Sequence, residues 1–450
     1  MNEWKKWRSR TLLFFYFVTF YIGLLYSGYL STELLYIKEI VDGKHAVTYY
    51  SVGLGISCFI ALLSVIVGSI YYDFTLDVKR LSVIVGFLVL IGNVLYVLPY
   101  SVWLVVTGIA LIYTAIASIA ALIAELTHIV EEENLTRIIS IVGMCKSIGV
   151  LAGPCLAFVF VKVDVTVGKW RLFYGNMPGI VIGSLGVPVV IGLCFIKNLA
   201  KLYDLKADAQ SKKRLLDDVD EREEKSDKLS LEEPSEPRQT FPKYFSTVRK
   251  IITGRHYTII LLTSTISVYT IQLVLNMITV IAVQMLQWEV VMIAYSRLAV
   301  MLGGVLFLMV PLIFSKYVKD FVLFYLTVVA VVIPIFVIAV LPQLYARPDV
   351  QKGMLFAISF LTGGLEMYLH VSSIAITAKL VRSEYQGIAE AVRQAVFYIG
   401  YTLSSFSVSP MYTYLTVSSC IVVAANVFSA VLLLFEVKYF MSRGEYEYET

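Results

Sequence analysis

The stretch SVWLVVTGIALIYTAIASIAALIA, from Ser101 to Ala124, carries no charged residue. About 20 consecutive apolar residues are enough to cross the hydrocarbon core of a bilayer as a helix. A second charge-free stretch runs from Val47 to Tyr72. Only helices and closed barrels satisfy every backbone group in lipid, and these runs lack the alternation of barrel strands. They therefore predict membrane-spanning helices.

The composition of the whole chain agrees with this prediction. Of the 450 residues, 58% are hydrophobic and 16% are charged, whereas soluble domains are about half apolar and a quarter charged. The formal net charge is +4, without a basic stripe that would indicate nucleic-acid binding. The cysteines lack metal-ligand spacing, and no nucleotide-binding loop or nucleophile motif occurs. We therefore expect no enzyme, no ATP-driven pump, no metal and no cofactor.

The apolar runs form two groups of six. The first group comprises residues 11–36, 47–71, 82–99, 101–127, 138–161 and 173–196. The second comprises residues 256–284, 290–314, 320–342, 353–378, 388–409 and 412–436. The sequence thus predicts an all-α polytopic membrane protein with 12 transmembrane helices in a 6+6 arrangement.

The segment between the two groups differs in composition. Residues 197–255 hold 14 Lys/Arg and 12 Asp/Glu, which favours a flexible linker that stays in water and is open to protein partners. The predicted segments are a tail at 1–10, bundles at 11–196 and 256–437, the linker at 197–255 and a tail at 438–450. With a cytosolic N-terminus, the tails and short loops on that side hold fourteen Lys/Arg against seven opposite. Because cytosolic loops carry the basic excess, both termini are expected in the cytosol.

Short motifs flank several of the runs. The loop after the second run reads Gly68-Ser-Ile-Tyr-Tyr-Asp73-Phe-Thr-Leu-Asp77-Val-Lys79-Arg80, and the fifth run contains Gly149-Val-Leu-Ala-Gly153-Pro154. Small residues permit close helix packing, a proline bends a helix, and acid–base pairs can latch helix ends. The candidate gating and packing residues are Gly68, Asp73, Asp77, Arg80, Arg137, Gly149, Gly153, Pro154, Gly387 and Arg393.

These motifs resemble those of the major facilitator superfamily. Within it, the chain is most similar to the lysosomal major facilitator superfamily domain-containing protein 8 subfamily, which is linked to neuronal ceroid lipofuscinosis. That similarity rests on the acidic-Thr-Arg loop ending at Arg137, on Tyr174-Gly-Asn-Met-Pro178 and on Tyr385-Gln-Gly387. The resemblance implies a pseudo-symmetric transporter fold in the lysosomal or endosomal membrane. Two features depart from it, because the fourth helix has no Arg and the loop at 68–80 lacks its later Gly.

Ionisable residues inside a membrane are costly and are functional candidates by default. Glu366 and His370 lie midway along the tenth run and, four residues apart, share one helix face. Such a pair could exchange a proton near neutral pH, so both are proton-coupling candidates. The alternative is a hydrogen-bonded pair that only locks helix packing.

Other polar residues in the runs are candidates for binding a substrate. Arg297 and Lys146 could hold an anionic group, or extend their charges to the membrane surface. Gln272 and Asn276 are four apart and could bond a substrate or a neighbouring helix. Glu33 ends the first run, where it forms either a solvated helix end or a gate.

The leading hypothesis is a secondary transporter of a small anionic molecule or ion, which works by alternating access and is coupled to protons. One alternative is channel-like anion (chloride) permeation on the same scaffold, from which saturation and proton dependence would distinguish it. Another is a non-transporting membrane interaction protein that acts through residues 197–255.

Overall fold

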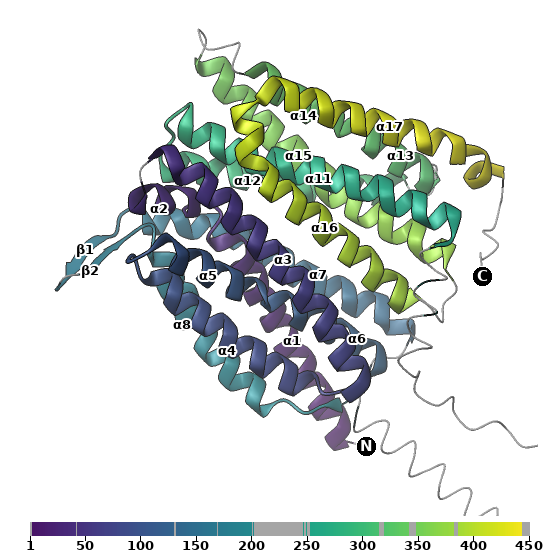
Figure 1. The fold of residues 1–450 in the computed structure, drawn as a ribbon. Helices are drawn as coiled ribbons and strands as arrows, with labels where there is room; N and C mark the ends of the chain where they lie inside the picture. The colour runs from purple at the N-terminus through teal and green to yellow at the C-terminus, as the bar shows by residue number, and fades with distance from the viewer. Residues whose placement is uncertain are drawn as a thin grey trace, which may run out of the picture.

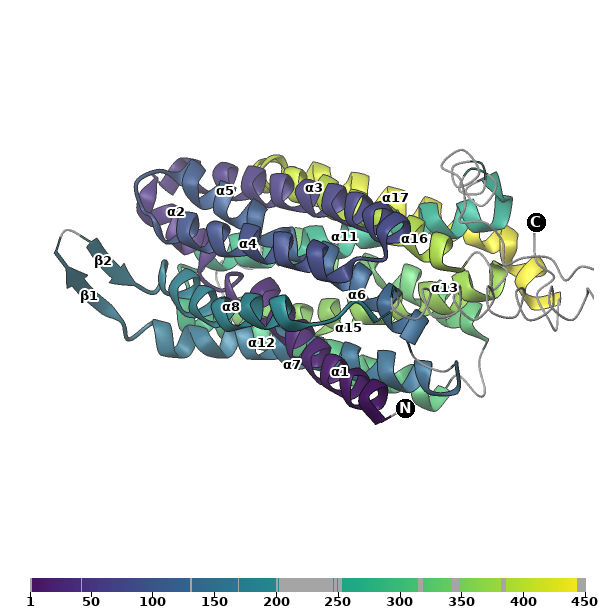
Figure 2. The ribbon, with the colours of Figure 1, turned by 90° about the horizontal axis from the view of Figure 1, so that it is seen from below.

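The computed structural model describes residues 2–41, 43–129, 132–168, 170–199, 253–314, 319–341, 348–381 and 386–442, and residues 201, 246 and 249. The predicted linker and C-terminal tail lie largely outside the described residues. Long helices run side by side, with the N-terminal helices on one side and the C-terminal helices on the other (Figure 1). A β-hairpin projects from one end, and both termini lie towards the other (Figures 1 and 2). These are called the hairpin end and the termini end.

The N-terminal helices are mostly continuous across the predicted runs. Their bounds are α1 Asn2–Gly28, α2 Glu33–Ile40, α3 Gly43–Thr75, α4 Val78–Val97, α5 Val102–Tyr113, α6 Ala115–Ile129, α7 Glu132–Phe160 and α8 Met177–Phe195. The predicted run 11–36 divides into α1 and the short helix α2. The run 101–127 breaks at Thr114, whose hydroxyl donates to the Leu111 carbonyl at 2.6 Å.

The C-terminal helices follow the same plan. Their bounds are α11 Arg255–Gln284, α12 Val290–Phe314, α13 Asp320–Ala330, α14 Val332–Val340, α15 Pro348–Leu380, α16 Gln386–Thr413 and α17 Leu415–Ser442. The run 320–342 breaks at Val331, three residues before Pro334. A proline cannot donate to the carbonyl four residues earlier and its ring crowds that group, which accounts for the break.

The described helices confirm an all-α polytopic membrane protein. Eleven segments are long and apolar enough to cross a membrane, with α5–α6 and α13–α14 each counting as one. Helix α16, at the predicted eleventh run, is not among these eleven, although it packs along α3 and α11. The count of 12 therefore stays a prediction.

Two hydrophobic cores lie within the bundle. One is built only from residues between Phe15 and Leu199, and the larger one is built mainly from residues between Tyr257 and Phe440. The larger core also takes in the hairpin-end parts of α2, α3 and α5, including Leu34 and Tyr50. The two sets of helices therefore share apolar contacts at the hairpin end.

Glycines set the closest helix contacts. A Cβ on Gly149 of α7 would lie 2.0 Å from the Phe20 carbonyl oxygen of α1, and one on Gly153 would lie 2.0 Å from the Ser27 Oγ. Across α12 and α15, a Cβ on Gly363 would lie 1.9 Å from the Val300 oxygen. Only glycine allows backbones to approach this closely.

The hairpin was missed in the sequence analysis. Strand β1, Asp164–Val167, pairs antiparallel with β2, Trp170–Phe173. Gly168 between them has φ +65°, the left-handed conformation that glycine adopts readily. The alternation of Asp164-Val-Thr-Val before this glycine was the available signal.

Polar contacts join the two sets of helices at the hairpin end. The Ser51 hydroxyl of α3 donates to the Ser405 carbonyl of α16 at 2.6 Å, and the Thr48 and Ser409 hydroxyls lie 3.2 Å apart. On the other side of the interface, the rings of Phe158 in α7 and Tyr295 in α12 lie 4.9 Å apart. Among the described residues, these contacts hold the two sets of helices together at the hairpin end, and they are called the hairpin-end seal.

Candidate functional site

Glu366 and His370 lie on α15, and both are half-buried. No hydrogen bond joins the two side chains within the described part of the chain. The His370 ring instead lies edge-on to Phe397 of α16, with 5.5 Å between ring centroids. The pair thus shares a helix face without direct bonding.

Glu366 is surrounded by groups from several helices. The Tyr401 side chain of α16 interacts with its carboxyl group, and Lys146 and Arg297 both act on it electrostatically. A narrow niche beside it is lined by Val268, Ile271, Leu369, Phe397 and Tyr401. Glu366 is therefore an acid between two cations, in an otherwise apolar and aromatic setting.

Lys146 comes from the other set of helices. It lies on α7, and its side chain is exposed even though Glu366 of α15 is within electrostatic reach. Lys146 and Glu366 thus place opposite charges on the two sets of helices, the cation on the N-terminal set and the acid on the C-terminal set.

Arg297 of α12 is 3% exposed. Its Nη2 donates to the Thr279 hydroxyl of α11, while its Nε is buried without a partner among the described residues. The guanidinium is thus held inside the bundle and does not extend to a surface.

Gln272 and Asn276 bond to each other along α11. The Gln272 Nε2 donates to the Asn276 Oδ1 at 3.3 Å, and the buried Asn276 Nδ2 has no partner among the described residues. One amide donor therefore remains free for a ligand or a water molecule.

Half-buried tyrosines complete this region, and the sequence analysis largely missed them. Tyr26 of α1 lies 5.8 Å from Tyr113 of α5, and Tyr398 lies 5.5 Å from Tyr401 on α16, between ring centroids. The charge of Glu366 acts electrostatically on both Tyr26 and Tyr401. The three-residue spacing of Tyr398 and Tyr401 was the signal available in the sequence.

Arg393 adjoins this group, because its charge acts on His370 and Tyr401. It is fully buried in α16, where its guanidinium stands 4.6 Å over the Phe397 ring and donates to the Ser373 hydroxyl of α15. The hydrogen bond to Ser373 therefore joins α16 to α15, and the cation–π contact with Phe397 lies within α16.

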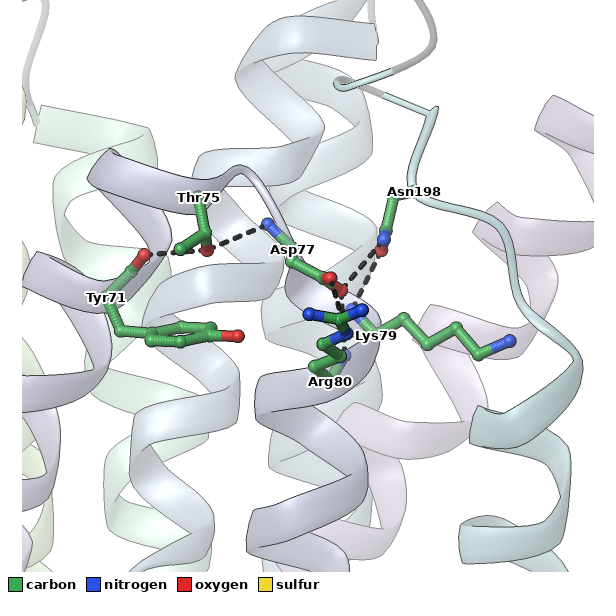
Figure 3. A network of polar contacts seen from close by, with 6 residues as sticks. All are labelled: Tyr71, Thr75, Asp77, Lys79, Arg80 and Asn198. Atoms are coloured by element: carbon green, nitrogen blue, oxygen red, sulfur yellow. Dashed lines mark hydrogen bonds and ion pairs between the residues drawn. The ribbon is translucent and has the colours of Figure 1, made fainter.

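The predicted latch loop forms a polar network at the termini end (Figure 3). The Asp77 carboxylate accepts from the Arg80 backbone N–H at 2.9 Å and from the Asn198 side chain at 2.8 Å. The Lys79 backbone N–H donates to the Asn198 Oδ1 at 2.9 Å. This network fastens the start of α4 to the segment that follows α8.

Leu76 stands in the same loop and has φ 48°. This left-handed conformation is uncommon for residues other than glycine. The loop lacks the later Gly of the related motif, and the backbone nevertheless turns at Leu76 in the way that a glycine favours.

The remaining motif residues are placed as follows. Gly68 of α3 faces Ala117 of α6, Pro154 lies inside α7, and Gly387 lies in the first turn of α16. The side chains of Asp73 and Arg137 lie outside the described part of the structure.

Comparison with known proteins identifies the superfamily. The profile of the Major Facilitator Superfamily matches residues 11–405. No curated protein matches the sequence.

Solved structures share the fold across almost the whole chain. A POT family transporter in complex with 5-aminolevulinic acid has a TM-score of 0.68 at 13% identity, covering 96% of each chain. A bacterial homolog of the human lysosomal transporter Spinster, inward-facing and unoccupied, has a TM-score of 0.66 at 11% identity, covering 97% of this chain and 98% of the other. A D-xylose–proton symporter has a TM-score of 0.65 at 10% identity, covering 94% and 97%.

Proposed function

The chain belongs to the Major Facilitator Superfamily, and from that premise we propose that it is a secondary transporter of a small anionic solute, coupled to protons. In transporters built from repeats, the substrate site lies near the bilayer midplane at the repeat interface. The observation that carries the proposal is the electrostatic effect of two cations on Glu366. Lys146 comes from the N-terminal helices, and Arg297 comes from the C-terminal helices.

Each candidate has a role in this scheme. Glu366 binds the coupling proton, and His370 on the same face exchanges it. Lys146 and Arg297 hold the anionic group, since the charges of both act on the same carboxylate. Gln272 and Asn276 supply amide hydrogen bonds, for which the free Asn276 Nδ2 is suited. The D-xylose–proton symporter among the similar structures supports the coupling to protons.

Transport requires the hairpin-end seal to open. In alternating access, one set of helices rocks against the other around a fixed site. The Ser51–Ser405 and Thr48–Ser409 contacts would then break as the site becomes accessible from the hairpin end.

The cellular setting is part of the proposal. The acidic-Thr-Arg loop and the Tyr-Gln-Gly loop support membership of the subfamily of major facilitator superfamily domain-containing protein 8, and hence a lysosomal or endosomal membrane. The two bundles are proposed to have six helices each. The excess of Lys/Arg in the loops on one side supports an orientation with both termini in the cytosol. Residues 197–255 would be available there to protein partners.

Proteoliposome flux tests this proposal. A panel of small anions and metabolites is offered under an imposed pH gradient, with the wild type beside Glu366→Gln. We expect saturable, gradient-driven uptake in the wild type. The Gln variant should lose accumulation but keep solute exchange without a gradient, because it retains the site but cannot release a proton.

Glu289→Gln is the matched control, since Glu289 is an exposed glutamate at the hairpin end. It should transport as the wild type does. Uptake that does not saturate and ignores both the gradient and the Glu366 substitution would favour the channel-like alternative.

A further inference from the structure

Glu33, the first residue of α2, is 1% exposed. Its Oε1 is buried and has no hydrogen-bond partner among the described residues. The expected solvated helix end is therefore wrong for this residue. A buried carboxyl group without a full set of partners is costly, so its position calls for a functional account.

The neighbours of Glu33 hold α2 against the C-terminal helices. Leu34 belongs to the larger core with α11 residues such as Ile278, and Leu35 packs against the cluster that contains Val290 and Ala294 of α12. Ala294 lies one helical turn before Arg297. Helix α2 thus places the Glu33 carboxyl at the hairpin-end side of Arg297.

Arg297 is incompletely bonded in the same region. It donates to the Thr279 hydroxyl, and its buried Nε has no partner among the described residues. Its charge acts on Glu33 as well as on Glu366. The charge of Arg297 therefore reaches two carboxyl groups without an ion pair to either among the described residues, one in the centre of the bundle and one at the hairpin end.

Other titratable groups surround Glu33. Its charge acts electrostatically on four of them, which are Tyr50 and Cys58 of α3, Tyr96 of α4 and Tyr113 of α5. Lys38 and Glu39 of α2 itself are exposed. Among the described residues, Arg297 is thus the cation that faces Glu33 from the elements packed around it.

We propose that Glu33 and an oxyanion group of the substrate compete for Arg297, so that binding of the anion passes a proton to Glu33. When the site is empty and the pH lies above the pKa of Glu33, its ionised carboxylate is the counter-ion of Arg297. When a carboxylate or sulfate group binds Arg297, Glu33 loses its counter-ion and takes up one proton. The anion and the proton then enter together, and for a singly charged carboxylate the buried charge is unchanged.

This inference rests on the proposed function and adds a coupling residue to it. Glu33 lies between the first two candidate spans. Burial raises the pKa of its carboxyl to about 8, and the charge of Arg297 opposes that rise. Arg297 stays charged throughout. The carboxyl is thus protonated at pH 6, where it leaves Arg297 to the anion, and largely ionised at pH 9, where it competes.

Sulfate binding to the purified full-length protein tests the inference without measuring transport. Thermal stabilisation by sulfate, titrated against chloride, which is not an oxyanion, at constant ionic strength, is recorded at pH 6 and pH 9. For the wild type, we expect the half-maximal sulfate concentration to be about tenfold lower at pH 6 than at pH 9. Glu33→Gln cannot ionise and should show the low value at both pH values.

Three further variants assign the effect. Glu39→Gln, an exposed glutamate of the same helix, should behave as the wild type, and Arg297→Gln should abolish the sulfate response. If Glu366→Gln and not Glu33→Gln removes the pH dependence, the inference is overturned. It is also overturned if sulfate stabilises neither the wild type nor Glu33→Gln. Saturable, gradient-driven flux alongside either result would leave the proposed function standing.

Discussion

Leu76 is the residue at which local conformation and packing conflict most clearly. Its left-handed backbone costs about 1–2 kcal/mol for a residue with a Cβ, yet its side chain is 6% exposed and belongs to the N-terminal core. Removing a buried Leu side chain costs about 2–5 kcal/mol. Burial therefore outweighs strain, which explains how Leu is accommodated at this left-handed position.

This balance gives a prediction for two substitutions at Leu76. Both Leu76→Ala and Leu76→Gly lose the buried side chain, but only glycine relieves the backbone. The Gly variant should therefore be more stable than the Ala variant, by about 1 kcal/mol, the reverse of the usual order in a helix. Thermal unfolding in detergent measures the difference. A less stable Gly variant would show that the turn carries no strain.

At the residue scale, sequence reasoning located charges but not their partners. The positions of Glu366, Arg297 and Lys146 within apolar runs identified them as candidates. The spacing of Gln272 and Asn276 predicted neighbours on one face, and they do bond. The link between Lys146 and Glu366 depends on how α7 and α15 face each other, which no local pattern encodes. The burial of Glu33 likewise depends on how α2 packs against α3 and α11.

At the scale of elements, the contact between α1 and α7 depends on glycines that leave space for the facing backbone. The missing Cβ of Gly149 leaves space for the Phe20 carbonyl, at 2.0 Å from where that atom would stand. Since the obstacle is backbone, the two helices would have to separate. We expect Gly149→Ala to lower stability by about 3 kcal/mol.

Gly143 on the same helix is the matched control for Gly149. A Cβ there would meet nothing within 4 Å, so Gly143→Ala should stabilise the helix by about 0.5–1 kcal/mol. Melting temperatures of the two variants in detergent measure the contrast. Equal effects of the two substitutions would mean that α1 and α7 do not pack through Gly149.

Long apolar runs identified most helices because hydropathy alone decides whether a segment of this length can enter a bilayer. The breaks at Thr114 and Val331 were not foreseen, since both lie inside uninterrupted apolar runs. They depend on a hydroxyl bonding to the preceding turn and on Pro334. The β-hairpin was missed because its strands are only four residues long and lie between two spans.

For the whole molecule, the two groups of apolar runs predicted the superfamily fold, and the match over residues 11–405 agrees with it. Which end is sealed could not be predicted. Alternative states share one sequence and differ only in how the helix sets meet. The seal at the hairpin end, through Ser51, Thr48 and their α16 partners, belongs to one such state.

The central claim is that this seal must open for the solute to cross. Thr48 and Ser409 offer the most direct test, because their hydroxyl oxygens are 3.2 Å apart on opposite sides of the interface. With the native cysteines replaced, a Thr48→Cys, Ser409→Cys double variant should form a disulfide under mild oxidation. We predict that solute flux in proteoliposomes stops on oxidation and returns on reduction, while each single variant is unaffected. Flux that continues with the disulfide in place would contradict alternating access and indicate a fixed, channel-like pathway.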